Sequence, residues 1–397
     1  MDALMLPLNW QRVRLGDIAE INPPTIIPNV FYYIDLENVE KGQLLNKQLM
    51  TKNKAPSRAR RLLSKNDILY QLVRPYQRNN YFFTLNGNYV ASTGYAQIRT
   101  LQNPSFLYFA LHSNYFVNAV LDRCEGTSYP AINSNELKKC EVILPPLNEQ
   151  IAIADILSDV DRYLYNLDAL ILKKESVKKA LRIKMLNQIL ASNGVEFREL
   201  GDIILSLKTG LNPRSFFKLN TTNANNYYVT IRELEDYTIK FTHQTDRIDD
   251  NALSLCLKRS NLEKDDILFS GTGTIGKVSI IEKNPNNWAI KEGIYSIKPN
   301  KKIVFPRFLM FCLESSNIQN DIKNKSFGGI VKSIPMNDLQ QIQIPLPPLN
   351  EQIAIANILS DLDHEIISLK NKKRQFDNIK KALNHDLMSA KIRVLKK

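Results

Sequence analysis

The chain has 397 residues, 44% hydrophobic and 23% charged, a globular composition that argues against a disordered or fibrous protein. Lysine and arginine outnumber aspartate and glutamate by 53 to 40, so the net charge of +13 favours an anionic partner, nucleic acid first; a protein that is merely basic is the alternative. The four cysteines show no CxxC spacing, no secretory signal pattern opens the sequence, and no apolar run approaches the roughly 18 residues that span a bilayer. We therefore expect a cytoplasmic protein with reduced thiols.

An internal repeat organises the chain. The segment LPPLNEQIAIADILSDVD at residues 144–161 returns at 346–363 as LPPLNEQIAIANILSDLD, with two of eighteen positions changed. The same motif, LGDI, stands near the start of both halves, at residues 15–18 and 200–203. Self-similarity over such a distance indicates duplicated structural units. We predict a first module at 1–143, a helical spacer at 144–191, a second module at 192–345 and a second helical spacer at 346–397.

Each module has the pattern of a mixed α/β domain. Strand-like runs stand at residues 89–90, 227–231 and 277–281, and a turn is indicated at 86–88. Helices are expected near 104–120 and 306–324. The pattern leaves the topology of the modules open.

The repeated segments predict two long helices. Each follows a proline pair, and the first contains neither proline nor glycine from Glu149 to Leu190, so it would be roughly 60 Å long. A stripe with alternating spacings of four and three residues runs along both, with Val177 and Ile379 expected to widen it. Its positions are Val160, Leu164, Leu167, Ile171, Lys174, Lys178, Leu181 and Met185, and then Leu362, Ile366, Leu369, Lys373, Phe376, Lys380, Leu383 and Leu387.

A single helix of this length cannot bury its own stripe, and the other copy is the obvious partner. The expected fold class is α+β: two α/β modules joined by two long antiparallel helices in a coiled coil, with the modules at opposite ends and an approximate two-fold relation. Two separate helices in two separate domains are the alternative.

No catalytic centre is apparent in the residues. GxxxxGK matches residues 271–277, but Val278 stands where a phosphate loop needs serine or threonine, and a strand is expected where it needs a helix. A glycine-rich turn that offers Thr272, Thr274 and Lys277 to a surface ligand is the favoured interpretation, and an NTP-hydrolysing enzyme is its rival. The NPPT word at residues 22–25 is interpreted as a turn, and the four histidines show no metal-ligand spacing.

Basic side chains interleaved with aromatic and amide groups are the candidates for binding. Guanidinium and ammonium groups contact phosphates, and arginine reads guanine edges. A solvated basic loop is the competing interpretation for each residue. The candidates are Arg58, Arg60, Arg61, Arg74, Tyr76 and Arg78 in the first module, and Arg214, Lys218, Thr272, Thr274, Lys277 and Lys332 in the second.

With these residues considered, the chain resembles the specificity subunit of type I restriction–modification enzymes over nearly its full length. The most specific element is the PLPPLNEQIAIA word, present twice. Further matches are PSRARRLLSKNDIL, LVRPYQRN and ASTGYAQIR in the first module, and TGLNPRSFFKL, YYVTIREL and KDDILFSGTGTIGKV in the second.

The resemblance implies a non-catalytic subunit with two target recognition domains, each reading one half of a split and asymmetric DNA site. The helical spacers would fix the gap between the half-sites and dock two methylation subunits, which use S-adenosylmethionine to methylate adenine. Restriction subunits would add ATP- and Mg²⁺-dependent cleavage of foreign DNA. This chain would bind no cofactor or metal itself. The expected docking residues are Leu147, Asn148, Glu149 and Gln150, with Leu349, Asn350, Glu351 and Gln352 in the second copy.

Two further interpretations remain open at this point. A scaffold would use its helical pair only to join partner proteins, without a role in DNA binding. A specificity subunit could instead serve a different class of methyltransferase.

Overall fold

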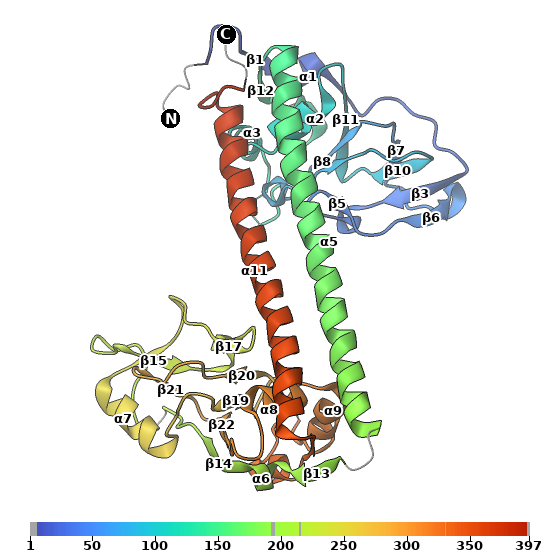
Figure 1. Ribbon diagram of the computed structural model, residues 1–397. Helices are drawn as coiled ribbons and strands as arrows, with labels where there is room; N and C mark the ends of the chain where they lie inside the picture. The colour runs from blue at the N-terminus through green and yellow to red at the C-terminus, as the bar shows by residue number, and fades with distance from the viewer. Residues whose placement is uncertain (1–5, 127, 192–194, 214–215, 330, 395–397) are drawn as a thin grey trace. The chain divides into compact units, whose positions relative to one another are not determined.

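The computed structural model describes residues 6–126, 128–191, 195–213, 216–329 and 331–394, and for 186–191 it describes the backbone alone. The chain divides into two compact units, each with one module and half of each long helix (Figure 1). Unit 1 comprises Met1–Ala169 and Asn371–Lys397, and unit 2 comprises Leu170–Lys370.

The module of unit 1 combines two four-stranded sheets with short helices. An antiparallel sheet has the order β2-β11-β8-β9, and a mixed sheet has the order β6-β3-β10-β7, in which β3 and β10 run parallel. The β-strands are β1 (Gln11–Arg14), β2 (Ala19–Ile21), β3 (Val30–Ile34), β4 (Val39–Glu40), β5 (Gln43–Leu44), β6 (Gln48–Thr51), β7 (Ala59–Leu62), β8 (Ile68–Gln71), β9 (Tyr81–Phe82), β10 (Tyr89–Ser92), β11 (Tyr95–Thr100) and β12 (Glu141–Leu144). The helices are α1 (Leu15–Ile18), α2 (Pro104–Ala110), α3 (Asn114–Leu121) and α4 (Ser134–Lys139), with 3-10 turns η1 (Leu36–Asn38), η2 (Lys52–Lys54) and η3 (Pro75–Gln77).

The module of unit 2 repeats this plan. Its antiparallel sheet has the order β14-β22-β19-β20, and its mixed sheet has the order β18-β15-β21, in which β15 and β21 run parallel. The β-strands are β13 (Glu196–Glu199), β14 (Ile204–Thr209), β15 (Asn226–Val229), β16 (Leu234–Glu235), β17 (Thr238–Ile239), β18 (Arg247–Ile248), β19 (Ile267–Ser270), β20 (Val278–Ile280), β21 (Trp288–Ile290), β22 (Ile294–Pro299) and β23 (Gln343–Leu346). The helices are α6 (Leu200–Ile203), α7 (Asp250–Arg259), α8 (Pro306–Leu313), α9 (Ser316–Asn324) and α10 (Met336–Gln340), with the 3-10 turn η4 (Ile231–Glu233).

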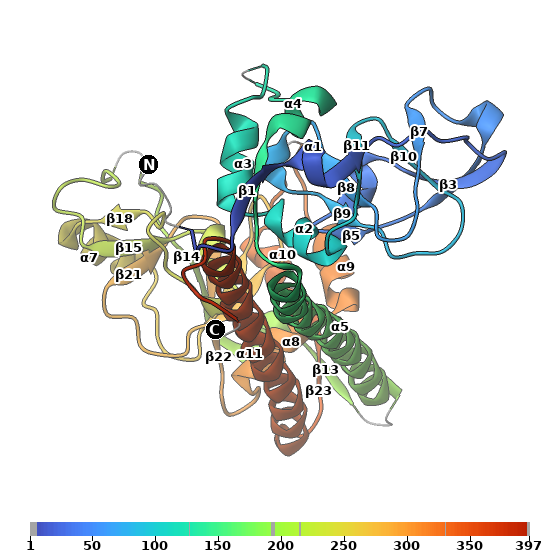
Figure 2. The same ribbon diagram turned by 90° about the horizontal axis from the view of Figure 1, so that it is seen from above.

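Equivalent elements close each module in the same way. β1 pairs antiparallel with β12, and β13 pairs antiparallel with β23, so each module's last strand returns to its first. Figure 2 shows α1, α3 and α4 gathered beside β1 in unit 1. The main apolar core of each unit joins the antiparallel sheet to the helices that follow it and to the first turns of a long helix. The expected mixed α/β modules are therefore confirmed.

The helices predicted near 104–120 and 306–324 are confirmed, and the structure has two helices in each range. The backbone turns at His112 in the first module, and Ser113 then starts α3 by accepting a hydrogen bond from the Phe116 amide at 3.2 Å. In the second module, α8 ends at Leu313 and α9 begins at Ser316. A serine at a helix start competes with continuation of the preceding helix, a break that apolar periodicity does not reveal.

The two long helices are α5 (Leu147–Ala191) and α11 (Leu349–Met388), of 45 and 40 residues. The predicted stripe is buried or partly buried at each position. Val177 and Ile379 are 45% and 50% exposed, so the expectation that they widen the stripe is wrong. They lie one residue before Lys178 and Lys380, and the aliphatic stems of those lysines occupy the stripe instead.

Within each unit, α5 and α11 run antiparallel. Ion pairs join Asp161 to Lys380 and Asp168 to Lys373 in unit 1, and Lys178 to Asp363 in unit 2. The residue numbers of all three pairs add up to the same value, which is the mark of an antiparallel register. The predicted antiparallel helical pair is confirmed in both units, whereas the placement of the modules at opposite ends stays a prediction.

A charge gradient along each helix explains this orientation. From residue 147 to 169, α5 carries five acidic side chains and one basic side chain, and from 170 to 191 it carries one acidic and six basic. The gradient returns in α11, with four acidic and one basic residue in 349–370, then two acidic and five basic in 371–388. Antiparallel pairing sets each acidic half against a basic half, whereas parallel pairing would oppose like charges.

His112 should make the stability of unit 1 depend on pH. Its Nδ1 lies 2.7 Å from the carbonyl oxygen of Tyr108, and burial lowers its pKa to about 4. An unfolded histidine titrates near 6.5, so the stabilisation is complete above that pH and is lost as the pH falls toward 4. Between pH 7 and pH 5 we expect the free energy of unfolding to fall by up to about 2 kcal/mol more in the wild type than in His112→Gln.

Urea denaturation at the two pH values measures this difference. The exposed His243 provides the control, since His243→Gln should keep the wild-type pH dependence. An unchanged pH dependence in His112→Gln would show that another group is responsible.

Three absences hold for the described part of the chain. None of its helices combines the length and the apolarity that crossing a membrane requires. Within the same residues, no cluster of three or more histidine, cysteine, aspartate or glutamate side chains could hold a metal ion. The four cysteines, all of which are described, form no disulfide.

Candidate nucleic-acid interface

A turn and a hairpin loop meet at the same place in both modules. In unit 1, the turn that follows β8 meets the loop 125–131, where the Arg74 amide donates to the Pro130 carbonyl at 2.7 Å. In unit 2, the turn that follows β19 meets the loop 327–333, where the Gly273 amide donates to the Lys332 carbonyl at 2.8 Å. Arg74 and Gly273 therefore occupy equivalent backbone positions, and both have positive φ, 55° and 81°.

The turn in unit 1 separates two arginines that the sequence grouped together. The Arg74 guanidinium lies 4.2 Å from the ring centroid of Tyr129, which is 64% exposed. Arg78 instead donates to the His112 carbonyl at 2.9 Å and to the Asn114 side chain at 2.7 Å, and burial lowers its pKa. Arg78 thus holds the turn against α3, whereas the Arg74 side chain lies over the exposed ring of Tyr129. Tyr76, between them, is 49% exposed.

The glycine-rich turn in unit 2 is explained by packing. A Cβ atom on Gly271 would lie 2.3 Å from the Tyr295 ring, and one on Gly276 would lie 2.2 Å from the Gln319 side chain. The expected strand follows as β20, and Lys277 Nζ donates to the Ile231 carbonyl at 3.1 Å. The chain continues from the turn into a strand and not into the helix that a phosphate loop needs, so the phosphate-loop interpretation has no structural support here.

The remaining candidates of the second module have different surroundings. Thr272 bridges to Ser333, which brings Thr272 and Lys332 together at the turn and hairpin loop. Thr274 accepts a hydrogen bond at its carbonyl from the Ser270 hydroxyl, at 2.6 Å. Lys218 is exposed and belongs to the segment that precedes β15. Arg214 lies outside the described residues.

The arginine cluster of the first module lies on the other sheet, at edge strand β7. Arg58 pairs with Asp35 at 2.5 Å and donates to the Tyr33 hydroxyl at 3.2 Å. Arg60 and Arg61 line an open pocket of about 480 Å³ together with residues 22–25, the predicted turn, in which Asn22 has a φ of 57°. Burial lowers the pKa of Arg61, and its buried Nε has no hydrogen-bond partner among the described residues.

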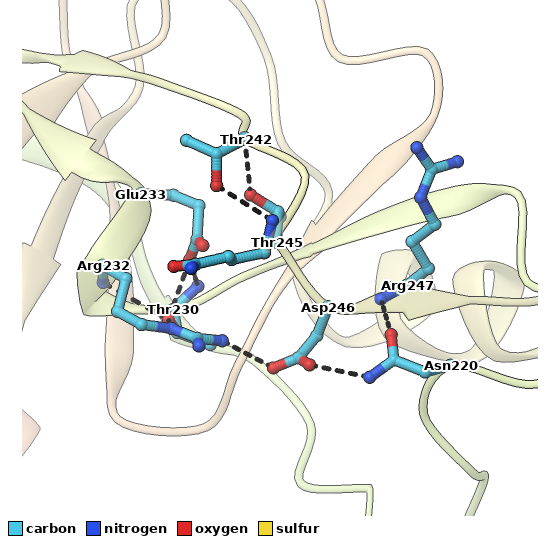
Figure 3. A network of polar contacts seen from close by, with 9 residues as sticks. Asn220, Thr230, Arg232, Glu233, Thr242, Thr245, Asp246 and Arg247 are labelled. Carbon is cyan, nitrogen blue, oxygen red and sulfur yellow. Dashed lines mark hydrogen bonds and ion pairs between the residues drawn. The ribbon is translucent and has the colours of Figure 1, made fainter. Parts of the chain in front are cut away.

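A network of polar contacts also connects residues in and beside the mixed sheet of unit 2 (Figure 3). Asp246 pairs with Arg232 at 2.7 Å and accepts from Asn220 at 2.9 Å, and the Asn220 side-chain oxygen accepts from the Arg247 amide at 2.8 Å. Thr230 and Glu233 form a capping box at the start of η4. The residues predicted from the sequence did not include Arg232, Arg247 or, in unit 1, Lys47. The repeated Tyr-Tyr pair at 32–33 and 227–228 indicates the equivalent strands, but not the cations that the fold brings to them.

The expected docking residues at the helix starts fall into two groups. Gln150 and Gln352 are 1% exposed, and each holds its helix to its module. Gln150 accepts from the Asn103 amide at 3.1 Å and Gln352 from the Phe305 amide at 2.8 Å, and each donates to a carbonyl of the preceding proline pair. These two glutamines are therefore buried against their own modules in this structure, and a docking role for them stays a prediction.

The other docking residues are mostly exposed. Leu147 and Leu349 are 56% and 38% exposed, and Asn148, Asn350 and Glu351 are also exposed. Glu149 is an exception, since it is 4% exposed and accepts a hydrogen bond from Trp10 Nε1 at 3.1 Å. One turn further along, Ile151 and Ile353 are 44% and 37% exposed. The repeated segment therefore exposes leucine, isoleucine and asparagine side chains at the start of both long helices.

Comparisons with known proteins agree with this duplicated arrangement. Residues 7–174 and 192–376 match the family model described as the type I restriction modification DNA specificity domain. The putative type I restriction enzyme MjaX specificity subunit of Methanocaldococcus jannaschii is 31% identical over 269 residues, which cover 66% of this chain and 62% of the relative. The MjaVIII specificity subunit of the same organism is 24% identical over 99% of this chain and 95% of its own length.

Two solved structures share the fold. The type I restriction–modification S subunit from M. genitalium has a TM-score of 0.59 and 18% identity, and the match covers 96% of this chain and 98% of that one. A chain from a study of complex assembly and conformational transition of the type I system has a TM-score of 0.55 and 21% identity, with the same coverage. The protein, with its two matched domains and its paired helices, belongs to the family of type I restriction–modification specificity subunits.

Proposed function

We propose that each module reads one half of a bipartite, asymmetric DNA site, that the helices set the gap, and that two methylation subunits dock at the helix starts. The observation that carries the proposal is one scaffold built twice with different loops. At equivalent backbone positions the first module has Arg74 and the second has Gly273, so the two modules offer different groups to DNA. The formal charge of +13 supplies attraction to phosphates.

Docking of two equal partners accounts for the duplicated helix starts. A surface that meets the same protein twice needs the same residues twice. Leu147, Asn148 and Ile151 provide them in one copy, and Leu349, Asn350 and Ile353 in the other. The chain itself would hold no catalytic residue. The methylation subunits would bring S-adenosylmethionine and methylate adenine, and restriction subunits would bring ATP- and Mg²⁺-dependent cleavage, inside the cell.

Mapping of methylated adenines tests the function directly. In cells that carry this chain and its methylation subunits, we expect one bipartite motif with two different halves, which disappears when the gene is deleted. Gel shifts of the assembled complex on duplex DNA separate this function from that of a scaffold. A complex that assembles but never binds DNA would favour the scaffold.

Arg74 should contribute to the specificity of one half-site. Arg74→Ala removes a guanidinium that is held over Tyr129 and that forms no ion pair with a carboxylate in the described part of the chain. We expect affinity for the cognate site to fall by about 1–3 kcal/mol and one half of the motif to relax, while the other half stays intact. Sequencing of methylated adenines after expression of the variant measures both halves at once.

Arg78→Ala provides the contrast, because Arg78 anchors the turn to α3. It should lower the unfolding midpoint of the protein, whereas Arg74→Ala should not. If Arg74→Ala left the methylated motif unchanged, Arg74 would not be a reading residue.

A further inference from the structure

A cation from the edge strand or the residue before it lies over an equivalent tyrosine ring in both mixed sheets. In unit 1, Lys47 Nζ lies 5.0 Å from the ring centroid of Tyr32 and donates to the Tyr89 hydroxyl at 3.2 Å. In unit 2, the Arg247 guanidinium lies 4.7 Å from the ring centroid of Tyr227 and 3.4 Å from its hydroxyl.

The two tyrosines are equivalent by strand register. Tyr32 in β3 pairs in parallel with Tyr89 in β10, and Tyr227 in β15 pairs in parallel with Trp288 in β21. An edge strand lies antiparallel on the other side of each tyrosine strand, β6 in unit 1 and β18 in unit 2. Arg247 opens β18 and pairs with Tyr227 itself, whereas Lys47 precedes β6 and lies two residues before Leu49, which pairs with Tyr32. The same edge of the sheet therefore supplies the cation in both modules, from different register positions.

Both cations keep their charge available. Lys47 and Arg247 are exposed, and among the described residues neither forms an ion pair with a carboxylate. Asp246, the acidic neighbour of Arg247, is already engaged by Arg232 and Asn220 (Figure 3). An aromatic face holds a cation in position without neutralising it, with a gain of about 0.5–1 kcal/mol at exposed sites. Each sheet therefore presents one oriented positive charge.

We propose that Lys47 and Arg247 both contact phosphates, so that each mixed sheet binds the DNA backbone independently of base sequence. This inference rests on the proposed DNA-reading function. The exchange of lysine for arginine between the modules fits a phosphate, which accepts a hydrogen bond from either side chain. A base edge would distinguish the two, since arginine makes a paired contact that lysine cannot copy.

Salt-dependent binding of the full chain to a duplex of arbitrary sequence tests the proposal, since a phosphate contact needs no recognition site. Each lost contact should reduce the slope of log K against log salt by about 0.9, and affinity by about eightfold at 0.1 M salt. We expect this loss for Lys47→Gln and for Arg247→Gln, and twice the slope change for the double variant. Lys47→Arg should keep both slope and affinity near those of the wild type.

Lys372→Gln is the matched control, because Lys372 lies over Tyr163 on the long helices, 5.6 Å from the ring centroid, and carries the same charge. It should leave the salt slope unchanged. The phosphate contacts would be overturned if the wild type bound DNA and the double variant had the same affinity and salt slope as Lys372→Gln. The proposed function would then still stand. A wild-type chain that fails to bind any duplex, alone or with methylation subunits, would overturn both.

Discussion

Replacing Lys178 by methionine should lower the free energy of unfolding by about 3–5 kcal/mol, whereas the same change at Lys380 should cost about 1 kcal/mol or less. The two lysines are equivalent in the repeat and pair with equivalent aspartates, Asp363 and Asp161. They differ in burial. The side chains of Lys178 and Asp363 are 10% and 12% exposed, and those of Lys380 and Asp161 are 33% and 35% exposed.

The larger effect at Lys178 follows from the network around it. Lys178 Nζ lies 2.5 Å from Asp363 and donates to the Tyr237 hydroxyl at 2.8 Å, and that hydroxyl donates to Glu314 at 2.7 Å. Arg182 completes this side-chain network with an ion pair to Glu314 at 2.5 Å. Burial raises the pKa of Asp363, which Lys178 opposes. Without Lys178, the aspartate would stay buried without its cation, and the module would lose a link to both helices.

Chemical denaturation of the two variants measures the difference. Adding Asp363→Leu to Lys178→Met should restore most of the stability, because it removes the uncompensated charge and fills the space with an apolar group. Equal losses at Lys178 and Lys380 would show that burial does not govern these pairs. A double variant no more stable than Lys178→Met would show that the loss comes from the lysine's packing rather than from its charge.

The long helices were the part of the fold that the sequence predicted best. Their apolar stripe has one period over many turns, and only a helix with a long partner satisfies it. The misplacement of Val177 has a physical reason, since hydrophobicity alone favours valine over the neighbouring Lys178. The buried ion pair with Asp363 reverses that preference. The opposed charge gradients of the two helices were readable in the sequence and would have given the antiparallel orientation independently.

The modules were predicted only as a class, because their strands are short and pair across long distances. β1 pairs with β12 across about the whole module, and nothing local in Gln11–Arg14 specifies that partner. The same limit affects the candidate site. Arg74 and Arg78 are close in the sequence and were predicted as one basic cluster. In the structure, Arg74 lies over the Tyr129 ring and Arg78 donates to the His112 carbonyl. Lys47 showed no local motif, since only the fold brings it over Tyr32.

Glu149 and Glu351 stand in identical sequence and should respond very differently to mutation. Glu149 is 4% exposed and accepts from Trp10 Nε1 at 3.1 Å and from Arg393 Nε at 3.0 Å, so it joins the first residues of unit 1 to its last described ones. Glu351 is exposed. Since a hydrogen bond to a charged group is worth about 1.5–3 kcal/mol, Glu149→Gln should lower the free energy of unfolding by about 2–4 kcal/mol. Glu351→Gln should change it by less than about 0.5 kcal/mol.

Two measurements separate the roles of this pair. Trypsin should cleave after Lys391 faster in Glu149→Gln, because release of Arg393 frees the segment that contains both basic residues, and the Glu351 variant should be cut at the wild-type rate. Co-purification with the methylation subunits should weaken in Glu351→Gln, which removes a charge from the exposed docking surface without unfolding the chain. Equal losses of stability in both variants would show that Glu149 and Glu351 have the same structural role. The difference in their burial would then have no effect on the free energy of unfolding.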